Sequence, residues 1–346
     1  MKNITRVSAL AASTMLAALA MAGCATSSNP SETDAAAGSG DREKVELNVG
    51  YIDTSINGVG LIAVADELGL WEEAGIDVNL IPFTNGPTQI QAMAAGSLDI
   101  GYIGGGATWM PASGQATIIT PNEATYGDFV IATPDSGATS VKDLKGLRVG
   151  VPEGGSGEMI LSLALEEAGL TTDDIIKVPL DPPNVVSSFV AGQIDVAAIF
   201  SPLSDQIFES VPDAEVLANN EDFPETEFVG GWVASNQAVA DKADAVSRFL
   251  EVWIQANDWR LENVEEAVQL AADESGAPVE QLQGQADALE WWTSDVILEN
   301  NESGKTYEQF EALEDLFVKL GRIPAKVPAE DFVNIELFAQ AKEALQ

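Results

Sequence analysis

The side chains that could do chemistry in this sequence are hydroxyls, amides and carboxyls, because the chain has no histidine and one cysteine, Cys24. Without histidine, neither a Ser-His-Asp nor a Cys-His nucleophile system can form. An imidazole or thiolate zinc site in the mature fold is excluded in the same way, and we expect no metal and no cofactor. Recognition by hydrogen bonds, charge and apolar contact remains.

These polar side chains gather in loops that follow short apolar runs. In α/β sheets, ligands bind beyond the carboxyl ends of the strands, and helices that start there offer free N–H groups to a ligand. The loops lie at Asp53–Asn57, Thr84–Thr88, Gly104–Thr108, Glu153–Glu158, Pro182–Asn184 and Phe200–Ser204. From them and from nearby aromatics we select as candidate ligand-binding residues Asp53, Ser55, Asn57, Asn85, Thr88, Gly105, Thr108, Tyr126, Glu153, Ser156, Glu158, Asn184, Phe200, Ser201 and Trp232.

Two other kinds of chemistry are poorly supported by these loops. The glycine cluster at 154–157 is not a phosphate loop, because a P-loop requires a lysine that this stretch lacks. Asp53, Glu153 and Glu158 could indicate paired-carboxylate catalysis. Acids are abundant throughout the chain, however, so this pattern is weakly specific.

The charge of the bound molecule stays open at this point. The loops contain no lysine or arginine, since Lys142, Lys145 and Arg148 precede their strand rather than follow it. A sulfonate would have to be held by helix ends and hydroxyls. A cationic or neutral aromatic solute is equally compatible with the acids and aromatics Asp53, Glu153, Glu158, Glu227, Tyr102, Tyr126, Phe200 and Trp232.

The composition describes a globular, strongly acidic protein. Hydrophobic residues make up 46% of the chain, and 55 Asp and Glu stand against 16 Lys and Arg, for a net charge of −39. Nucleic-acid binding needs clustered cations, so we expect no nucleic-acid partner. The acids are expected to form a solvated surface.

The first residues predict export. Lys2 and Arg6 precede an uncharged apolar run, Val7–Ala22, and small residues lead to Cys24. The end of this segment resembles the bacterial lipoprotein box, with Met21 where that box usually has leucine. The resemblance implies a signal peptide at 1–23, lipidation of Cys24 and a membrane anchor. Residues 24–44 are polar and small, and we expect a flexible tether.

The elements that position the loops alternate between strands and helices, which predicts an α/β fold. We expect strands at Val45–Ile52, Ile76–Phe83, Ile100–Ile103, Ala116–Thr120, Phe129–Thr133, Leu147–Val151, Ile175–Leu180, Val196–Phe200, Glu215–Leu217 and Phe228–Ala234. Helices are expected from Gly60 to Leu68, 85 to 96, Met159 to Ala168 and 181 to 191, and Ser201 should open a short one. From Asp244 the chain reads as helical to its end, with helices near Val264–Ala272, Val279–Trp292, Tyr307–Leu320 and Asp331–Leu345.

A repeated sequence pattern divides this series of elements into two units. Ala95-Gly-Ser-Leu-Asp-Ile returns as Ala191-Gly-Gln-Ile-Asp-Val. Each copy leads into a short apolar strand and then a loop suited to a ligand. Asp99 and Asp195 stand at the start of those strands, away from the loops, so we interpret them as structural turn residues.

Several stretches together resemble the solute-binding proteins of bacterial ABC importers, in the branch for nitrate, taurine, aliphatic sulfonates and thiamine-pyrimidine precursors. They are Leu47–Ile52, Leu70–Val78, Ala95–Gly104, Asp143–Pro152, Ala191–Val196 and Leu320–Pro324. The resemblance implies a type 2 periplasmic-binding-protein fold, with two α/β lobes, a hinge and a central ligand cleft. Lobe one would comprise 45–132 and 235–346 with the helical tail, and lobe two 133–234, with crossovers near 132–134 and 232–235.

The resemblance also implies a function. The protein would be an extracytoplasmic, lipid-anchored monomer that captures a sulfonate-, taurine- or thiamine-precursor-like solute by lobe closure and delivers it to an ABC permease and ATPase. A binder of a cationic or neutral aromatic solute on the same fold, or a non-transport sensor, is the alternative, and a secreted enzyme ranks last. The thiamine-pyrimidine enzymes of this family use their own histidine, and the menaquinone-synthesis enzymes of this fold are cytoplasmic. We therefore expect no enzyme.

Overall fold

The computed structural model describes residues 42–346, so the expected signal peptide, Cys24 and most of the expected tether lie outside the described residues. The first two described residues, Arg42 and Glu43, already contact the folded part of the chain. Arg42 forms an ion pair of 2.7 Å with Glu251, and the carbonyl of Glu43 accepts a hydrogen bond from Arg248.

The first sheet contains the elements β1 (Val45–Ile52), β2 (Ile76–Phe83), β3 (Ile100–Ile103), β4 (Thr117–Thr125), β10 (Phe228–Ala234) and β11 (Leu289–Trp291). Their spatial order is β11-β4-β10-β3-β1-β2. β1 pairs in parallel with β2 and β3, while β10 is antiparallel to β3 and β4. We call the part of the structure around this sheet the first lobe.

The second sheet contains the elements β5 (Asp128–Ala132), β6 (Arg148–Val151), β7 (Ile176–Pro179), β8 (Val196–Phe200) and β9 (Glu215–Asn219). Their order is β7-β6-β8-β5-β9. β6 is parallel to β7 and β8, and β5 is antiparallel to β8 and β9. This repeats the pattern β2-β1-β3-β10-β4, and the part around it is the second lobe.

Two strands lie in a different lobe from the one expected. β10 falls inside the range 133–234 that we assigned to lobe two, but it pairs with β3 and β4 of the first sheet. β5 falls inside the range 45–132 that we assigned to lobe one, but it pairs with β8 and β9 of the second sheet. A short apolar run predicts a strand without saying which sheet it joins. The chain therefore passes between the sheets at 126–127 and again at 220–227. We call these segments the first and the second crossing, and we propose them as the lobe boundaries.

Asp99 and Asp195 have equivalent roles in the two sheets. Asp99 Oδ2 accepts a 3.0 Å hydrogen bond from the backbone N–H of Asn48 and pairs with Lys242. Asp195 Oδ2 accepts one of 2.8 Å from the N–H of Arg148 and pairs with the Arg148 side chain. Each aspartate thus ties the start of a central strand to its neighbour, as expected for structural turn residues.

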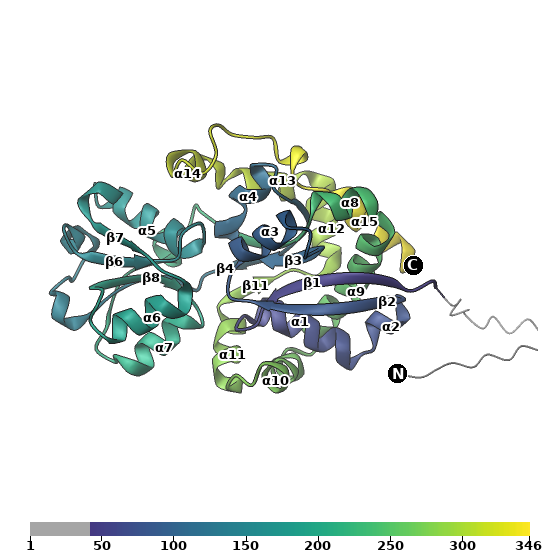
Figure 1. Ribbon diagram of the computed structural model, residues 1–346, viewed down its shortest axis with the longest axis horizontal. Coiled ribbons are helices and arrows are strands. Elements are labelled where there is room, and N and C mark those ends of the chain that lie inside the picture. The colour runs from purple at the N-terminus through teal and green to yellow at the C-terminus, as the bar shows by residue number, and fades with distance from the viewer. Residues whose placement is uncertain (1–41) are drawn as a thin grey trace, which may run out of the picture. The chain divides into compact units, whose positions relative to one another are not determined.

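Helices cover both sheets (Figure 1). In the first lobe they are α1 (Ile56–Glu67), α2 (Leu70–Glu73), α3 (Gly86–Ala94) and α4 (Trp109–Ala112). The second lobe has α5 (Ser156–Glu167), α6 (Pro182–Val190) and α7 (Leu203–Ser210). α1 begins four residues before the expected Gly60, because its first turn is buried along its whole length.

The helical tail comprises α8 (Asn236–Asp241), α9 (Ala243–Glu262), α10 (Val264–Ser275), α11 (Val279–Asp287), α12 (Ser294–Ser303), α13 (Lys305–Glu311), α14 (Glu314–Lys319) and α15 (Ile335–Ala344). The helix expected at 279–292 ends at Asp287, because 289–291 joins the first sheet as β11. The helix expected at 307–320 is divided into α13 and α14. α9 packs on the first sheet, where the Phe249 ring lies 5.2 Å from that of Trp232.

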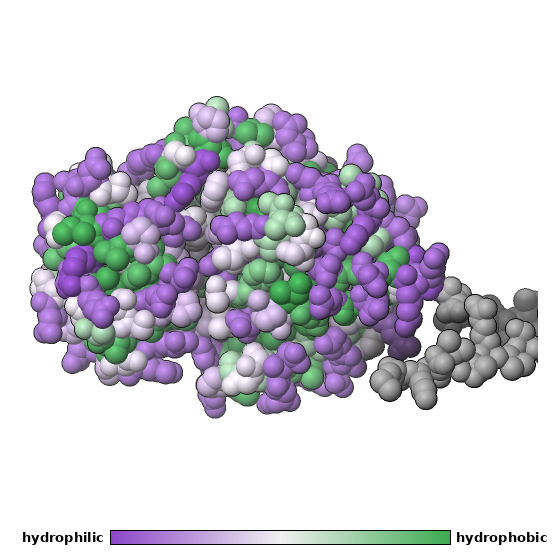
Figure 2. Space-filling view, viewed as in Figure 1, coloured by the Kyte–Doolittle hydropathy of each residue, from purple (hydrophilic) through white to green (hydrophobic). Residues whose placement is uncertain are grey.

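The surface is mostly hydrophilic on the face shown in Figure 2. Apolar side chains are exposed on both edge strands of the second sheet, with Ile176 on β7 and Val216 on β9. Among residues 42–346, none of the helices combines the length and apolar character needed to cross a membrane.

Candidate ligand-binding site

A pocket lies between the two lobes, at the carboxyl ends of parallel strands from both sheets. β1 ends at Ile52, β3 leads from Tyr102 to Gly104, β6 leads into Pro152 and β8 ends at Phe200, and each of these positions lines the pocket. The cavity encloses about 850 Å³ of empty space, its open mouth included. This is the place where α/β sheets bind ligands.

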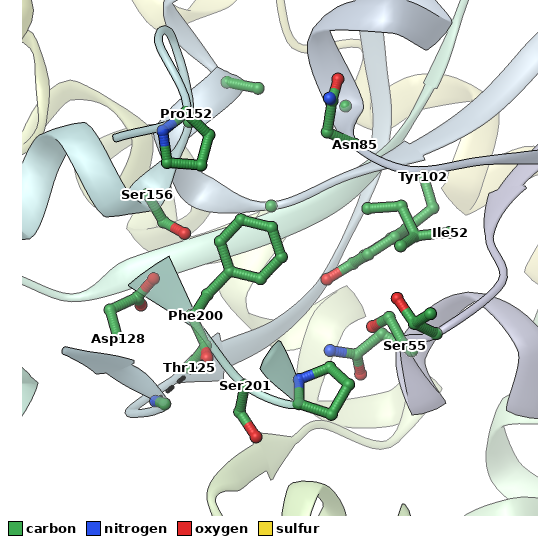
Figure 3. A pocket seen from close by; sticks show the side chains of 18 of the residues that line it. Ile52, Ser55, Asn85, Tyr102, Thr125, Asp128, Pro152, Ser156, Phe200 and Ser201 are labelled. Atoms are coloured by element: carbon green, nitrogen blue, oxygen red, sulfur yellow. Dashed lines mark hydrogen bonds between the residues drawn. The ribbon is translucent and has the colours of Figure 1, made fainter. Parts of the chain in front are cut away.

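Both lobes contribute side chains to this pocket (Figure 3). From the first lobe come Ile52, Thr54, Ser55, Asn57, Asn85, Gly86, Pro87, Tyr102, Gly104, Ala107, Thr125, Gln285, Ala288 and Leu289. The second lobe and the first crossing contribute Gly127, Asp128, Pro152, Glu153, Gly155, Ser156, Phe200, Ser201 and Pro202.

The pocket brings together about half of the residues predicted from the sequence. Those that line it are Ser55, Asn57, Asn85, Glu153, Ser156, Phe200 and Ser201. The prediction that strand-end loops of both units meet at one cavity agrees with their positions. Their contact with a ligand stays a prediction.

The other predicted residues do not line this pocket: Asp53, Thr88, Gly105, Thr108, Tyr126, Glu158, Asn184 and Trp232. Several of them serve the fold. Thr88 and Thr108 each donate a side-chain hydrogen bond to the backbone one turn earlier. Trp232 is completely buried against α9. Tyr126 lies in a separate hollow with residues of the second crossing.

Other lining residues were missed by the sequence analysis. Gln285, Ala288 and Leu289 reach the pocket from the end of α11, far along the chain from the loops. Thr125 and Asp128 flank the first crossing, a polar stretch with Gly127 between two apolar strands. That stretch has the character of the selected loops and could have been selected by the same rule.

Four helices begin at the pocket wall, namely α1, α3, α5 and α7. Ser55 stands before α1 without capping it, and the N–H of Ile56 donates instead to Gln285 Oε1 at 3.0 Å. Asn85 caps α3 by accepting from the N–H of Thr88 at 3.0 Å. The positive ends of these helices can stabilise an electron-rich group of a ligand.

Glu158 is held by cations outside the pocket lining. Lys177 Nζ lies 2.7 Å from Glu153 Oε1 and 2.6 Å from Glu158 Oε1, and Arg322 pairs with the other oxygen of Glu158. Burial raises the pKa of Glu158, but hydrogen bonds from Lys177 and Arg322 outweigh it, so the pKa lies below its ordinary value. Glu158 is therefore charged and already paired, which explains why it is not available to a ligand.

The charges on the pocket wall are negative. In the part of the chain that the structure describes, the lining includes the carboxylates of Asp128 and Glu153 and no lysine or arginine. Glu153 is paired with Lys177, whereas Asp128 is buried and has no cation beside it among the described residues. Burial raises the pKa of Asp128 to about 6.

A buried polar network supports the floor of the pocket. The Tyr102 hydroxyl donates to Glu123, whose other oxygen accepts from Asn122. Asn57 Oδ1 accepts from Asn122 Nδ2 at 3.2 Å, and Arg260 Nη2 donates to Asn122 Oδ1 at 3.0 Å. Because Tyr102 and Asn57 also line the pocket, this network fixes two of its polar side chains.

Burial also shifts the pKa values of two ionisable groups in this network. It raises the pKa of Glu123 to about 7, although hydrogen bonds and the charge of Arg260 act in the other direction. It lowers the pKa of Arg260 to about 10. Among residues 42–346, acids are not grouped in a way that could hold a metal ion.

Together, two α/β lobes of matching topology and a pocket between them define a two-lobed solute-binding protein of the periplasmic type. The family model described as NMT1/THI5 like matches residues 57–267. A protein of Brucella abortus (strain 2308), provisionally named a binding protein, is 39% identical over 297 residues, which cover 86% of this chain and 92% of its own. The chain belongs to the NMT1/THI5-like family, which confirms the resemblance expected from the sequence.

Two further comparisons support the same class. A protein of Bacillus subtilis (strain 168), provisionally named as binding aliphatic sulfonates, is 29% identical over 247 residues, covering 68% of this chain and 71% of its own. The alkanesulfonate-binding protein SsuA from Xanthomonas axonopodis pv. citri has a similar structure, with a TM-score of 0.67, 23% identity and coverage of 85% and 99%. The expected fold class is thereby confirmed.

The fold also occurs in an enzyme. The desulfurization enzyme DSZB matches with a TM-score of 0.62 and 14% identity over 88% of this chain and 100% of its own. At that identity the likeness shows the fold alone.

Proposed function

We propose that this protein is a receptor that captures a small organic solute between its lobes and delivers it, unchanged, to an ABC permease and its ATPase. The observation that carries this proposal is the pocket, which both lobes line at the carboxyl ends of their parallel strands. A ligand held there would contact both lobes and stabilise their closed arrangement.

The two crossings support closure of this kind. Only residues 126–127 and 220–227 connect the sheets along the described chain, and they lie together around a hollow lined by Tyr126, Phe223 and Glu227. A few residues at each crossing can absorb a hinge rotation. In this proposal the protein acts as a monomer outside the cytoplasm, held to the membrane by lipid on Cys24.

The pocket favours a cationic or neutral solute with a flat, partly apolar body. Its described lining has two carboxylates, no basic side chain, and the aromatic rings of Tyr102 and Phe200. Aromatic faces attract cations and flat rings, while an unpaired carboxylate repels anions. A thiamine-precursor-like pyrimidine belongs to this solute class.

A sulfonate is the second candidate, and helix N-termini favour it. Four helices begin at the pocket, and such ends bind anions without a basic side chain. The sulfonate specificity named for the Bacillus subtilis relative points in the same direction.

Thermal-shift screening of the full-length chain against amines, aminopyrimidines, aromatic acids and sulfonates tests the proposal. A true ligand raises the melting temperature in proportion to the logarithm of its excess over Kd. The bound solute should be recovered chemically unchanged after prolonged incubation. If no solute class shifts the melting temperature, or if the binder is converted to a product, the receptor function is wrong.

A further inference from the structure

Asp128 is a buried carboxyl group with an unused acceptor oxygen. It opens β5, lines the pocket, and is only 1% exposed. Its Oδ2 accepts a 3.3 Å hydrogen bond from Asn220 Nδ2, and its backbone N–H donates to Asn220 Oδ1 at 2.6 Å. Its Oδ1 has no hydrogen-bond partner in the part of the chain that the structure describes. Asn220 therefore fixes the carboxyl group and leaves one oxygen free.

The register of the second sheet places Phe200 beside this carboxyl group. Asp128 and Phe200 are direct partners in the antiparallel pair of β5 and β8. Partners of this kind project from the same face of a sheet, about 5 Å apart. Figure 3 shows the Asp128 carboxyl group on the same side of the pocket as the Phe200 ring and the Ser156 side chain.

Within residues 42–346, no basic side chain forms an ion pair with Asp128. Burial raises the pKa of Asp128, and hydrogen bonding by the Ser156 hydroxyl and the Asn220 amide, both neutral groups, offsets this only in part. Opposite it lies Phe200, and the nearby Glu158 on α5 is occupied by Lys177 and Arg322. Buried carboxylates are ordinarily paired, because an unpaired charge costs several kcal/mol. A missing partner at the wall of a ligand pocket indicates that the ligand supplies it.

Glu123 shows what a satisfied buried acid looks like in the same protein. One of its oxygens accepts from Tyr102 and the other from Asn122, and the charge of Arg260 lies in the same network. Asp128 differs from it in the free Oδ1 and in its position on the pocket wall.

We propose that Asp128 is the specificity-determining residue of the pocket and receives a protonated amine, amidine or ring N–H of the solute, whose flat apolar body lies against Phe200. This inference rests on the proposed receptor function and narrows it. It assigns the positively charged or N–H-donating end of the solute to the second lobe. At neutral pH a sulfonate or carboxylate is disfavoured at that end, because Asp128 is mostly ionised there and repels an anion.

The test compares matched probes on the full-length chain by isothermal titration calorimetry. Benzylamine and 4-aminopyrimidine carry the required donor, benzyl alcohol replaces the amine by a hydroxyl, and benzenesulfonate and taurine represent the sulfonates. Each is titrated into the wild-type protein, into Asp128→Asn, and into Asp135→Asn, which removes an exposed acid outside the pocket.

We expect at least one donor-bearing probe to bind the wild type and to lose about 10- to 100-fold in affinity in Asp128→Asn, as for the loss of a charge-assisted hydrogen bond. Benzyl alcohol should bind weakly and equally to both, and Asp135→Asn should behave as wild type. Asn220→Ala, which frees the carboxyl group to rotate, should give a smaller loss in the same direction.

The possible failures are distinguishable. If sulfonates bind and the amines do not, or if amine affinity is the same in Asp128→Asn, the role of Asp128 is wrong while the receptor function stands. If none of these probes nor any solute of the thermal-shift panel binds, the receptor function itself fails. A melting curve for each variant shows that it is folded.

Discussion

Arg322 and Glu158 form an ion pair that joins the turn after the tail helix α14 to the first turn of α5, and so joins the first lobe to the second. The Arg322 guanidinium also lies 5.5 Å from the ring centre of Trp109, whose Nε1 donates to the Gly154 carbonyl at 3.2 Å. We call Trp109, Gly154, Glu158 and Arg322 the lobe clasp. It stands beside the pocket and holds the lobes in the arrangement that forms it.

Replacing Arg322 by alanine should weaken ligand binding. The change removes one cation from the buried Glu158 and leaves Lys177 as its remaining partner. We expect a loss of about 1–3 kcal/mol in the closed arrangement, since the pair is mostly buried. Calorimetry with a binding solute measures it as a higher Kd.

Lys326→Ala is the matched control. Lys326 also forms an ion pair, with Asp315 at 2.7 Å, but both side chains are largely exposed. Exposed pairs of this kind contribute little. Equal losses in Arg322→Ala and Lys326→Ala would contradict the clasp.

A methyl group at Gly106 should hold the lobes apart. A Cβ at this position would lie 2.0 Å from the backbone nitrogen of Ser156, in the second lobe. Backbone atoms cannot yield as a flexible side chain does, so Gly106→Ala should lower ligand affinity and enlarge the radius of gyration of the liganded protein in small-angle X-ray scattering.

Gly104→Ala provides the comparison two residues away. A Cβ at Gly104 would meet no atom within 4 Å, and its backbone angles suit alanine. Because Gly104 lines the pocket, closure is the readout for this variant, and its radius of gyration with bound solute should match that of the wild type. A normal affinity in Gly106→Ala would show that the lobes do not need this approach.

Asp128→Asn should stabilise the unliganded protein at neutral pH. Burial raises the pKa of Asp128 from its ordinary value of 3.8 to about 6, so the folded state holds its proton more tightly than the unfolded chain does. The favourable contribution of the protonated carboxyl is complete below about pH 4 and is lost as the pH rises through 6. At pH 7.5 the cost is about 3 kcal/mol at most, and asparagine removes it.

Urea unfolding at pH 7.5 and at pH 4 measures this difference. The variant should exceed the wild type at pH 7.5 and match it near pH 4. Glu153, Glu158 and Lys177 are present in both proteins, so their titration cancels in the comparison. A wild type that is more stable than the variant at pH 7.5 would mean that the carboxylate already has a partner.

Arg260→Met should destabilise the protein and disturb the pocket. Arg260 is 1% exposed, donates to Asn257 and Asn122, and lies 4.5 Å from the Trp291 ring centre. Its loss removes these hydrogen bonds and the positive charge that lowers the pKa of Glu123, so Glu123 must take up a proton to stay buried, at a total cost of about 1–3 kcal/mol. Adding Glu123→Gln should recover part of that loss in urea unfolding. Additive effects of the two changes would show that these groups act independently.

The strands were largely predictable from the sequence, and the partners of the pocket residues were not. Five strands have the predicted bounds, among them β1 and β8, because apolar runs between turn residues are local signals. Which sheet β5 joins depends on its pairing with β8 and β9, and a local strand pattern does not show which strands will pair. Gln285 reaches the pocket from a helix that the local pattern placed only as part of a tail.

The candidate site shows the same division between local and distant information. Ser156 and Phe200 were found because they follow strands, which is a local property. Glu158 was selected for its loop position. Its ion pair with Arg322, which lies far along the chain, could not be predicted from that position. Asp128 lies outside the six selected loops, directly before the predicted strand Phe129–Thr133, and Asn220, which fixes its carboxyl group, is far along the chain.

The chain leaves the first sheet after β4 and returns to it only with β10. This path determines the order in which an emerging chain can complete the two lobes. The first sheet begins with Val45 but needs β10, which ends at Ala234, and its edge strand β11, which ends at Trp291. The second sheet starts later and has all of its strands by Asn219. As the chain emerges N-terminus first, the lobe that starts second is therefore the first to be finished. The lobe that starts first stays incomplete, with one edge of β3 unpaired, until β10 has emerged.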